Sequence, residues 1–133
     1  MVTYVEGRRI LVAAPEYLNT VHILDATDLG DIVKVGQWRF PDNKPTGSLT
    51  WSTHDFNIRD GKVYQGHYHG GVVVWGLRTL AEAQSPPLLA WILPTGPKNT
   101  GGNAPMTWDA FPADNGAILV GDMTLGFVTL REL

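Results

Sequence analysis

The sequence predicts an all-β protein built from repeated antiparallel sheets, and three observations support this prediction. Fifteen glycines and nine prolines in 133 residues indicate many turns between short elements. Short runs rich in valine, isoleucine and aromatic residues lie between those turns, and such runs favour strands. The same order of turn and run occurs three times along the chain, which indicates a structural repeat.

The stretch 52–75 gives the clearest strand pattern. Two dipeptides, Asp60-Gly61 and Gly70-Gly71, separate three β-rich runs. Both dipeptides reach positive φ at low cost, as two-residue hairpins require, so the stretch predicts a three-stranded antiparallel meander. The predicted pairs are Arg59 with Lys62, Ile58 with Val63, Phe56 with Gln65, His54 with His67, His69 with Val72, and His67 with Val74.

An internal repeat extends this meander to the whole chain. Glycine turns at Gly7, Gly61 and Gly116 are 54 and 55 residues apart. The triplet 53–55, Thr-His-Asp, recurs at 107–109 as Thr-Trp-Asp. A constant period of this length means that each repeat is one supersecondary unit, which buries its apolar faces against neighbouring units.

Each unit is expected to hold four strands. The central unit has expected strands at 53–59, 62–69, 72–77 and about 88–93, with a helical turn within 78–87. The first unit starts within a strand near Tyr4 and continues at 8–14, 20–25 and about 32–40, and the third has strands at 106–112, 117–122 and 126–131. The connections 41–51 and 94–105 are rich in glycine, proline, asparagine and threonine, which predicts surface loops.

Four-stranded meanders at a constant period are typical of β-propeller blades. We expect one partial propeller domain over 1–133, with blade 1 at about 1–40, blade 2 at about 52–93 and blade 3 at about 106–133. Propellers close with about four to eight blades, whereas this chain supplies about two and three-quarters. We therefore expect a C-terminal portion of a propeller, completed by further blades from the same or another chain. The alternative is an open stack of three sheets with exposed edges.

Both faces of the central unit are expected to be apolar, as a sheet between two neighbours requires. One face is predicted to carry Phe56, Ile58, Val63 and Val74, and the other Tyr64, Tyr68, Val73 and Trp75. Among the tryptophans, Trp75 and Trp91 are expected in the core.

The composition narrows the classes of function. A formal net charge of −3 gives no support for nucleic-acid binding, and the absence of cysteine excludes disulfides and thiolate ligands within the chain. No apolar run is long enough for a transmembrane helix. The first residues lack the basic and apolar regions of a signal peptide.

The motifs 53–55, 60–64 and 68–75, with further matches at 21–28 and at 108–109 plus 121–128, resemble those of LVIVD-repeat β-propellers. These propellers are found in secreted and cell-surface proteins of bacteria and archaea. The resemblance implies a propeller fold and an extracellular or cell-surface location, and it implies no well-defined reaction. Two departures are Gly76, where the family usually has aspartate, and a repeat longer than most in the family.

His54, His67 and His69 form a candidate metal centre. In the predicted register all three lie on one face, and imidazole nitrogens bind divalent transition metals. Asp122 occupies the His67 position one unit later and is the candidate fourth ligand, whereas Asp55 points to the opposite face unless a bulge rotates it. The alternative is that the histidines cap strand ends and bond to loop backbones. No other cofactor is expected.

Two aspartates and two tryptophans are candidates for contacting a partner. Asp55 and Asp109 are equivalent by repeat, and we expect each carboxylate to accept backbone N–H bonds from a neighbouring blade rather than to act as a catalytic pair. Trp51 and Trp108 precede or open the first strand of a unit, where loops converge, so they are candidate ligand contacts.

The expected function is a non-enzymatic surface or scaffold module that binds a protein or polymer partner. The predicted binding surface comprises the loops 41–51 and 94–105 and the adjoining strand ends. The alternative is a metal-binding or metalloenzyme propeller that uses the histidine cluster. The sequence leaves open whether the protein is an enzyme.

Overall fold

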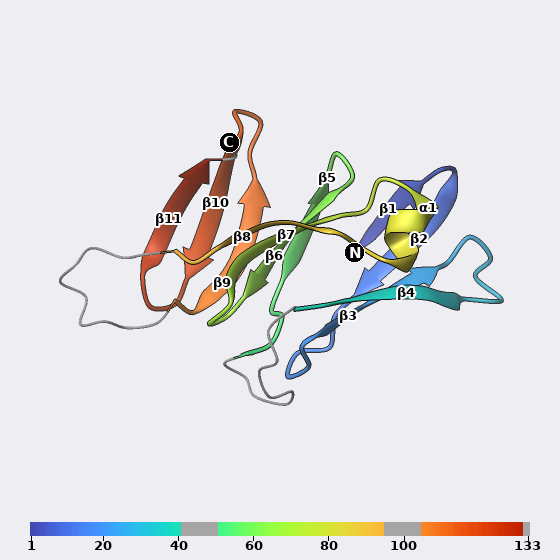
Figure 1. The fold of residues 1–133 in the computed structure, drawn as a ribbon, viewed down its shortest axis with the longest axis horizontal. Coiled ribbons are helices and arrows are strands. Elements are labelled where there is room, and N and C mark those ends of the chain that lie inside the picture. The colour runs from blue at the N-terminus through green and yellow to red at the C-terminus, as the bar shows by residue number, and fades with distance from the viewer. Residues whose placement is uncertain (41–50, 95–104, 132–133) are drawn as a thin grey trace.

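A computed structural model describes residues 1–40, 51–94 and 105–131, and these residues form three antiparallel sheets and one short helix. The sheets follow one another across the molecule in chain order (Figure 1). The predicted all-β class is therefore confirmed. Most of the predicted connections 41–51 and 94–105 lies outside the described residues.

Sheet 1 has the strand order β1-β2-β3-β4, with bounds Val2–Val5, Arg8–Ala13, Thr20–Asp25 and Val33–Arg39. Its first hairpin turns at Glu6 and Gly7, which both have positive φ, 47° and 82°. A turn with positive φ at both central residues matches the right-handed twist of the flanking strands.

Sheet 2 has the order β5-β6-β7-β8, with bounds Phe56–Arg59, Lys62–His67, Gly71–Gly76 and Leu88–Ile92. The helix α1, Leu80–Gln84, connects β7 to β8 and confirms the predicted helical turn. Thr79 caps it, because its hydroxyl accepts the backbone N–H of Glu82.

Sheet 3 has β9, β10 and β11 in consecutive order, with bounds Thr107–Pro112, Ala117–Asp122 and Gly126–Arg131. The repeated runs found in the sequence occupy equivalent strands in all three sheets. The runs 9–12, 62–64 and 117–120 lie in β2, β6 and β10, and the runs 21–24, 72–75 and 127–130 lie in β3, β7 and β11.

The predicted register holds for β5 with β6 and is wrong for β6 with β7. Phe56 pairs with Gln65 as predicted, but His67 lies opposite Gly71 instead of Val74. The connection between β6 and β7 has three residues, 68–70, rather than two. This odd shift moves side chains of β7 to the other face of the sheet.

A β-bulge at the start of β5 breaks the predicted pairing of His54 with His67. The backbone N–H of His54 donates to Gly66 O at 3.0 Å, and the N–H of Gly66 donates to Asp55 O at 2.8 Å. Two residues therefore lie opposite one, which redirects the side chains of 54 and 55.

Sheet 2 is buried on both faces, as predicted for the central unit. Against sheet 1, Trp38 stacks on Trp75 with ring centroids 6.0 Å apart and planes 7° from parallel. This core comprises Val5, Ile10, Val12, Val21, Ile23, Trp38 and Phe40 with Phe56, Val63, Val73, Trp75, Leu77 and Ala83. Against sheet 3 the core comprises Tyr64, Val72, Val74, Ala110, Ile118 and Val120. Relative to the prediction, Val73 and Trp75 have exchanged faces with Val74, because of the register shift.

Buried polar groups in sheet 2 are connected by hydrogen bonds. The amide of Gln65 donates to the Thr53 hydroxyl at 2.9 Å and accepts the indole N–H of Trp75 at 2.9 Å. A buried amide with both partners in place avoids the cost of unpaired polar atoms.

In the described part of the chain, no helix has the length and apolar character needed to cross a membrane.

Candidate functional site

His67 is fully buried on the side of sheet 2 that faces sheet 1. Its Nε2 lies 2.8 Å from Asn19 Oδ1, and its ring stacks on Phe40 with centroids 4.6 Å apart. Burial lowers the pKa of His67 to about 4, because an apolar setting disfavours the charged imidazolium. His67 is therefore a neutral core residue at physiological pH.

His54 lies on the opposite side of sheet 2, where sheet 3 begins. Its ring centroid is 3.5 Å from that of Trp108, with the planes tilted by 39°. Its Nδ1 is 3.2 Å from Trp108 O. The prediction that His54 and His67 share one face is thus wrong, because the bulge at His54 and Asp55 breaks the predicted pairing of these residues with β6.

The remaining candidate ligands are also apart. His69 lies in the loop between β6 and β7, and the buried Asp122 closes the turn between β10 and β11. Both oxygens of Asp122 are occupied, since they accept bonds from Met106 N, Thr107 Oγ1, Thr124 N and Leu125 N at 2.9–3.0 Å. Among the described residues, no group of three or more His, Cys, Asp or Glu side chains is placed to hold a metal ion. The geometry gives the metal hypothesis no support.

Tyr68 completes an aromatic group with His54 and Trp108. Its ring contacts the two others edge-on, with centroids 5.5 and 6.1 Å away. Its hydroxyl donates to Glu16 Oε1 at 2.6 Å. The pKa of Tyr68 is raised mainly by burial and, to a smaller extent, by this hydrogen bond. Tyr68 is buried, whereas Trp108 remains 42% exposed, so the indole forms the accessible part of the group.

Asp55 and Asp109 are held in the same way, as their repeat equivalence suggested. Each Oδ1 accepts the backbone N–H of the following residue at 2.7 Å. We expected the backbone of a neighbouring sheet as donor; that expectation is wrong, because the short side chain folds back on its own strand. The link between sheets comes instead from the Asn57 amide, which donates to Asp109 Oδ1 at 2.9 Å and to Ala110 O at 3.1 Å.

The charge of Asp55 acts on the carboxyl group of Asp109. Burial raises the pKa of Asp109, and the negative charge of Asp55 raises it further. Hydrogen bonds from Ala110 and Asn57 and the proximity of His54 act in the opposite direction. Asp55 is exposed, so it presents the more accessible charge.

Gly66 makes this arrangement possible, although the sequence analysis did not single it out. A Cβ at Gly66 would lie 2.5 Å from Trp108 O and 2.7 Å from Trp108 C. Because Gly66 has no side chain, β9 approaches β6 closely enough for Thr107 N to donate to Tyr68 O at 3.0 Å. A glycine inside a strand is a known sign of close backbone approach, so the signal was present.

The other tryptophans lie elsewhere. Trp51 is half-buried beside Phe40 and His67, with centroids 5.7 and 6.1 Å away, so the structure places it on the sheet 1 side and not with Trp108. Trp75 is a core residue, as expected. Trp91 is 45% exposed, contrary to expectation, because the outer strand β8 has an uncovered face; its indole N–H donates to Gly70 O at 2.7 Å.

The candidate site is therefore the surface formed by His54, Asp55, Trp108 and Asp109 between β5 and β9, called the β5–β9 surface below. The fold and this surface define an all-β repeat protein with an exposed indole flanked by an imidazole and two carboxylates. Comparison of the chain with protein-family models, curated proteins and solved structures gives no match.

Proposed function

We propose that the three sheets are blades of a β-propeller. Consecutive antiparallel strands in each sheet, the constant repeat and the burial of both faces of sheet 2 support this proposal. The resemblance to LVIVD repeats makes an extracellular or cell-surface location part of the same proposal.

The outer faces of the end sheets support the presence of further blades. On sheet 1, register pairs place Val2, Leu11 and Leu24 on one face together with Tyr4, which is 67% exposed. On sheet 3, the face turned away from sheet 2 carries Phe111, Leu119 and Phe127. Large exposed apolar faces are typical of surfaces that another element covers.

Two glycines at equivalent repeat positions add to this support. Gly66 lies where sheet 3 approaches sheet 2, and Gly121 is its counterpart 55 residues later. A Cβ at Gly121 would meet nothing within 4 Å. The proposal explains this glycine as the position where the next blade would approach.

We propose that the chain acts as a non-enzymatic surface or scaffold module, which binds a protein or polymer at the β5–β9 surface. The observation that carries the proposal is the exposed Trp108 indole, held against His54 beside the accessible carboxylate of Asp55. An oriented aromatic ring offers a stacking face for a sugar ring or an apolar side chain, and nearby polar groups fix the ligand's orientation.

The alternative, a metal-binding or metalloenzyme propeller, is less well supported. It needs His54, His67, His69 and Asp122 to converge, whereas the bulge and loop described above separate them. Elemental analysis of the protein and of His67→Ala tests it, since a stoichiometric metal that the substitution removes would favour the alternative.

A binding screen tests the proposed function. Wild-type protein would be titrated with a panel of soluble polysaccharides and extended peptides, with tryptophan fluorescence as the signal. Trp108→Ala is expected to weaken binding of a ligand found in this way by about tenfold or more, as loss of an anchoring aromatic does. Tyr4→Ala, which removes an exposed aromatic from sheet 1, is the matched control. Equal effects of the two substitutions, or no binding across the panel, would contradict the proposal.

A further inference from the structure

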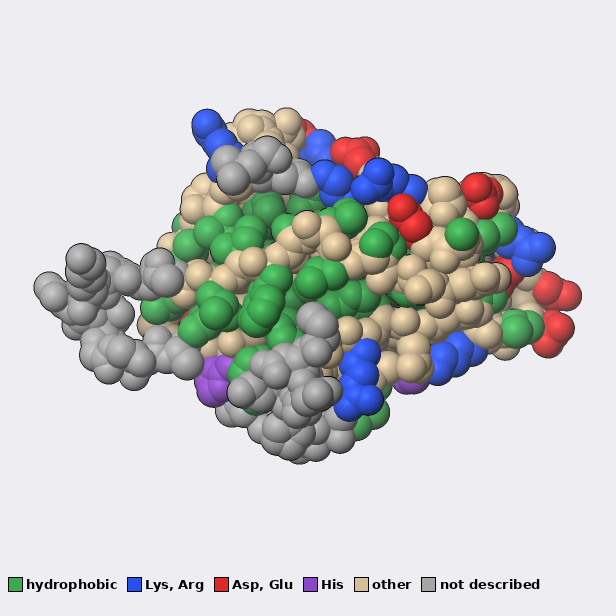
Figure 2. All heavy atoms as spheres, in the orientation of Figure 1, with side chains coloured by type: hydrophobic (Ala, Val, Ile, Leu, Met, Phe, Trp, Pro, Cys, Tyr) green, Lys and Arg blue, Asp and Glu red, His purple; other side chains and the backbone are tan. Residues whose placement is uncertain are grey.

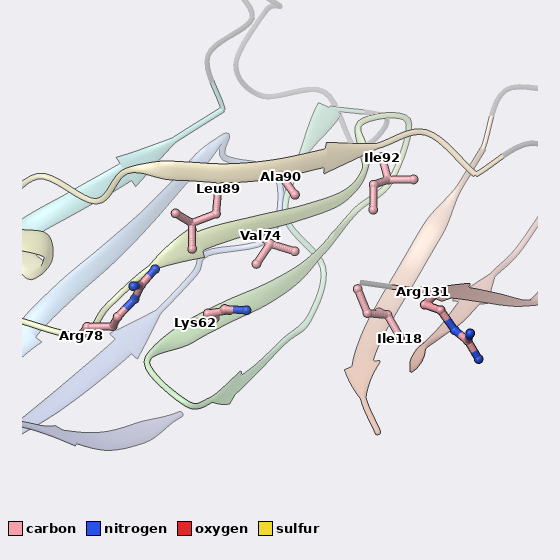
Figure 3. Close-up of a pocket in the computed structure, with 8 residues that line it drawn as sticks. All are labelled: Lys62, Val74, Arg78, Leu89, Ala90, Ile92, Ile118 and Arg131. Atoms are coloured by element: carbon pink, nitrogen blue, oxygen red, sulfur yellow. The ribbon is translucent and has the colours of Figure 1, made fainter. Parts of the chain in front are cut away.

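A groove of about 460 Å³ opens between sheets 2 and 3, and its lining residues are separate from those of the β5–β9 surface. Its apolar wall comes from both sheets, and three cationic side chains complete its lining. The lining residues are Val74, Leu89, Ala90, Ile92 and Ile118 with Lys62, Arg78 and Arg131. Figure 3 shows Lys62 and Arg78 at one end of this cationic groove and Arg131 beyond Ile118 on the opposite side.

The groove lies where sheet 3 differs from the two other sheets. Sheets 1 and 2 each have a fourth strand, β4 and β8, whereas β11 is the last strand of sheet 3 in the described part of the chain. Within the described residues, β11 has no hydrogen-bonded neighbour on its outer edge. An unpaired edge offers a row of backbone donors and acceptors to another strand.

The fourth strands of sheets 1 and 2 are also covered differently. Helix α1 packs on β4, and Gly36 admits the carbonyl of Ala83 where a Cβ would collide. On β8, Leu89 and Trp91 are 40% and 45% exposed. Figure 2 shows hydrophobic side chains gathered across the middle of the face in view, in the region where Figure 1 places β8.

Among the described residues that line the groove, the charged side chains are all cationic. Neither Arg78 nor Arg131 has a carboxylate partner in the described part of the chain. By contrast, Arg8 pairs with Asp25 at 2.6 Å and Arg59 pairs with Asp114 at 2.5 Å. The groove is therefore complementary to a ligand that is apolar in the middle and acidic at its ends.

We infer that the cationic groove receives an extended acidic segment of a partner protein, which adds to β11 as a fourth strand. Main-chain hydrogen bonds to β11 would supply affinity, and alternate side chains of the added strand would face the groove. Apolar side chains of the segment would contact Ile92 and Val74, while acidic side chains at its ends reach the arginines. This inference concerns a different surface from the proposed partner site at Trp108.

A designed peptide tests the inference directly. The probe is fluorescein-labelled Glu-Thr-Val-Thr-Ile-Thr-Glu with blocked ends, which places two apolar and two acidic side chains on one face of a strand. Binding would be followed by fluorescence anisotropy. The charge-reversed peptide, with lysine in place of glutamate, is expected to bind at least about tenfold more weakly, because complementary charge is lost.

Protein variants identify the surface used. Arg78→Glu and Arg131→Glu are each expected to weaken peptide binding about tenfold. Arg39→Glu is the control, because it makes the same charge change on the exposed part of β4, and it should change the peptide's affinity by no more than about twofold. Ala90→Trp fills the groove without changing charge and should also abolish binding. Trp108→Ala should leave peptide binding unchanged, so that failure here and failure of the proposed partner site are separable.

Hydrogen exchange distinguishes strand addition from other occupants. Bound peptide is expected to slow amide exchange in β11, residues 126–131. The inference is wrong if the peptide does not bind or binds without protecting β11. If decanoate binds the groove as tightly as the peptide does, the groove is a site for anionic amphiphiles instead. If the protein self-associates and Arg131→Glu abolishes this self-association, the occupant is a second copy of the chain.

Discussion

Gly66 lies directly against the carbonyl group of Trp108: a Cβ on the glycine would stand 2.5 Å from the oxygen. This contact joins a strand of sheet 2 to a residue 42 positions later in sheet 3. Gly66 also holds the residue that Trp108 contacts, because its carbonyl accepts the backbone N–H of His54 at 3.0 Å. The packing of the two sheets and the geometry of the β5–β9 surface therefore depend on the same glycine.

Gly66→Ala is expected to destabilise the protein by about 1–3 kcal/mol, because the added methyl group must displace backbone of β9. Urea unfolding measures the change. Gly121→Ala is the matched control, since it alters the equivalent repeat position on an open face. Its effect should stay within about 0.5 kcal/mol. Similar losses for both substitutions would mean that sheet 3 does not approach Gly66 as described.

Gln65→Leu is expected to cost about 1–3 kcal/mol, although leucine is apolar and of similar size. The substitution leaves the Trp75 indole N–H and the Thr53 hydroxyl buried without their partner. Gln37→Leu, on the exposed part of β4, provides the comparison and should change the free energy of unfolding by less than about 0.5 kcal/mol. If the buried substitution proved neutral, the polar network would be incorrect.

His67 should make stability depend on pH. In the folded state its pKa is lowered to about 4, whereas in the unfolded state it is near 6.5, so the unfolded chain binds the proton first. The contribution of His67 to the free energy of unfolding is fully present above pH 6.5. It is lost as the pH falls toward 4, which lowers the free energy of unfolding by up to about 3 kcal/mol. Urea unfolding from pH 7 to 4 measures this change.

His67→Gln supplies the control for that measurement, because glutamine does not titrate. The variant should be less stable at pH 7, yet its stability should fall less between pH 6.5 and 4 than that of the wild type. Parallel pH profiles of the two proteins would show that His67 is accessible to protons in the folded state.

Asp25 is expected to make the stability of the protein depend on pH in a lower range than His67 does. Hydrogen bonds from Thr27 and then from Arg8 lower the pKa of Asp25 to about 2. Its contribution is present above the ordinary value of 3.8 and is lost as pH falls through about 2. Asp25→Asn should therefore lower the melting temperature at pH 7, and the difference from wild type should shrink between pH 4 and 2. A difference that does not vary with pH would contradict this assignment.

Much of the fold could be predicted because its determinants are local. Turns such as Glu6-Gly7 and Asp60-Gly61 combine positive φ with a flanking apolar run, and the strands follow from them. The repeat then transfers one unit's pattern to the others. The hairpin loop at 68–70 could not be predicted in this way. Tyr68 adopts a positive φ of 26°, which is rare for a bulky residue, and the loop is one residue longer than predicted.

The β5–β9 surface combines residues that the sequence assigns to two different candidate sites. Asp55, Trp108 and Asp109 are candidate partner contacts and His54 is a candidate metal ligand, whereas Trp51, the fourth candidate partner contact, lies on the sheet 1 side. Stacked repeats bring equivalent positions side by side, so the contact between His54 and Trp108 follows from the repeat itself. The bulge at His54 and Asp55 is formed by hydrogen bonds to Gly66, which also lies against Trp108 of sheet 3, and no pattern within a single unit reveals it.

The contact between the His54 and Trp108 rings is the most direct test of how the repeats pack. Proton NMR of the protein, with His54→Gln and Trp108→Phe for assignment, would measure nuclear Overhauser effects between side chains. Strong cross-peaks are expected between the His54 and Trp108 rings, whose centroids lie 3.5 Å apart, and none between His54 and His67. Cross-peaks between the two histidines, with none to Trp108, would contradict the face-to-face packing of successive sheets.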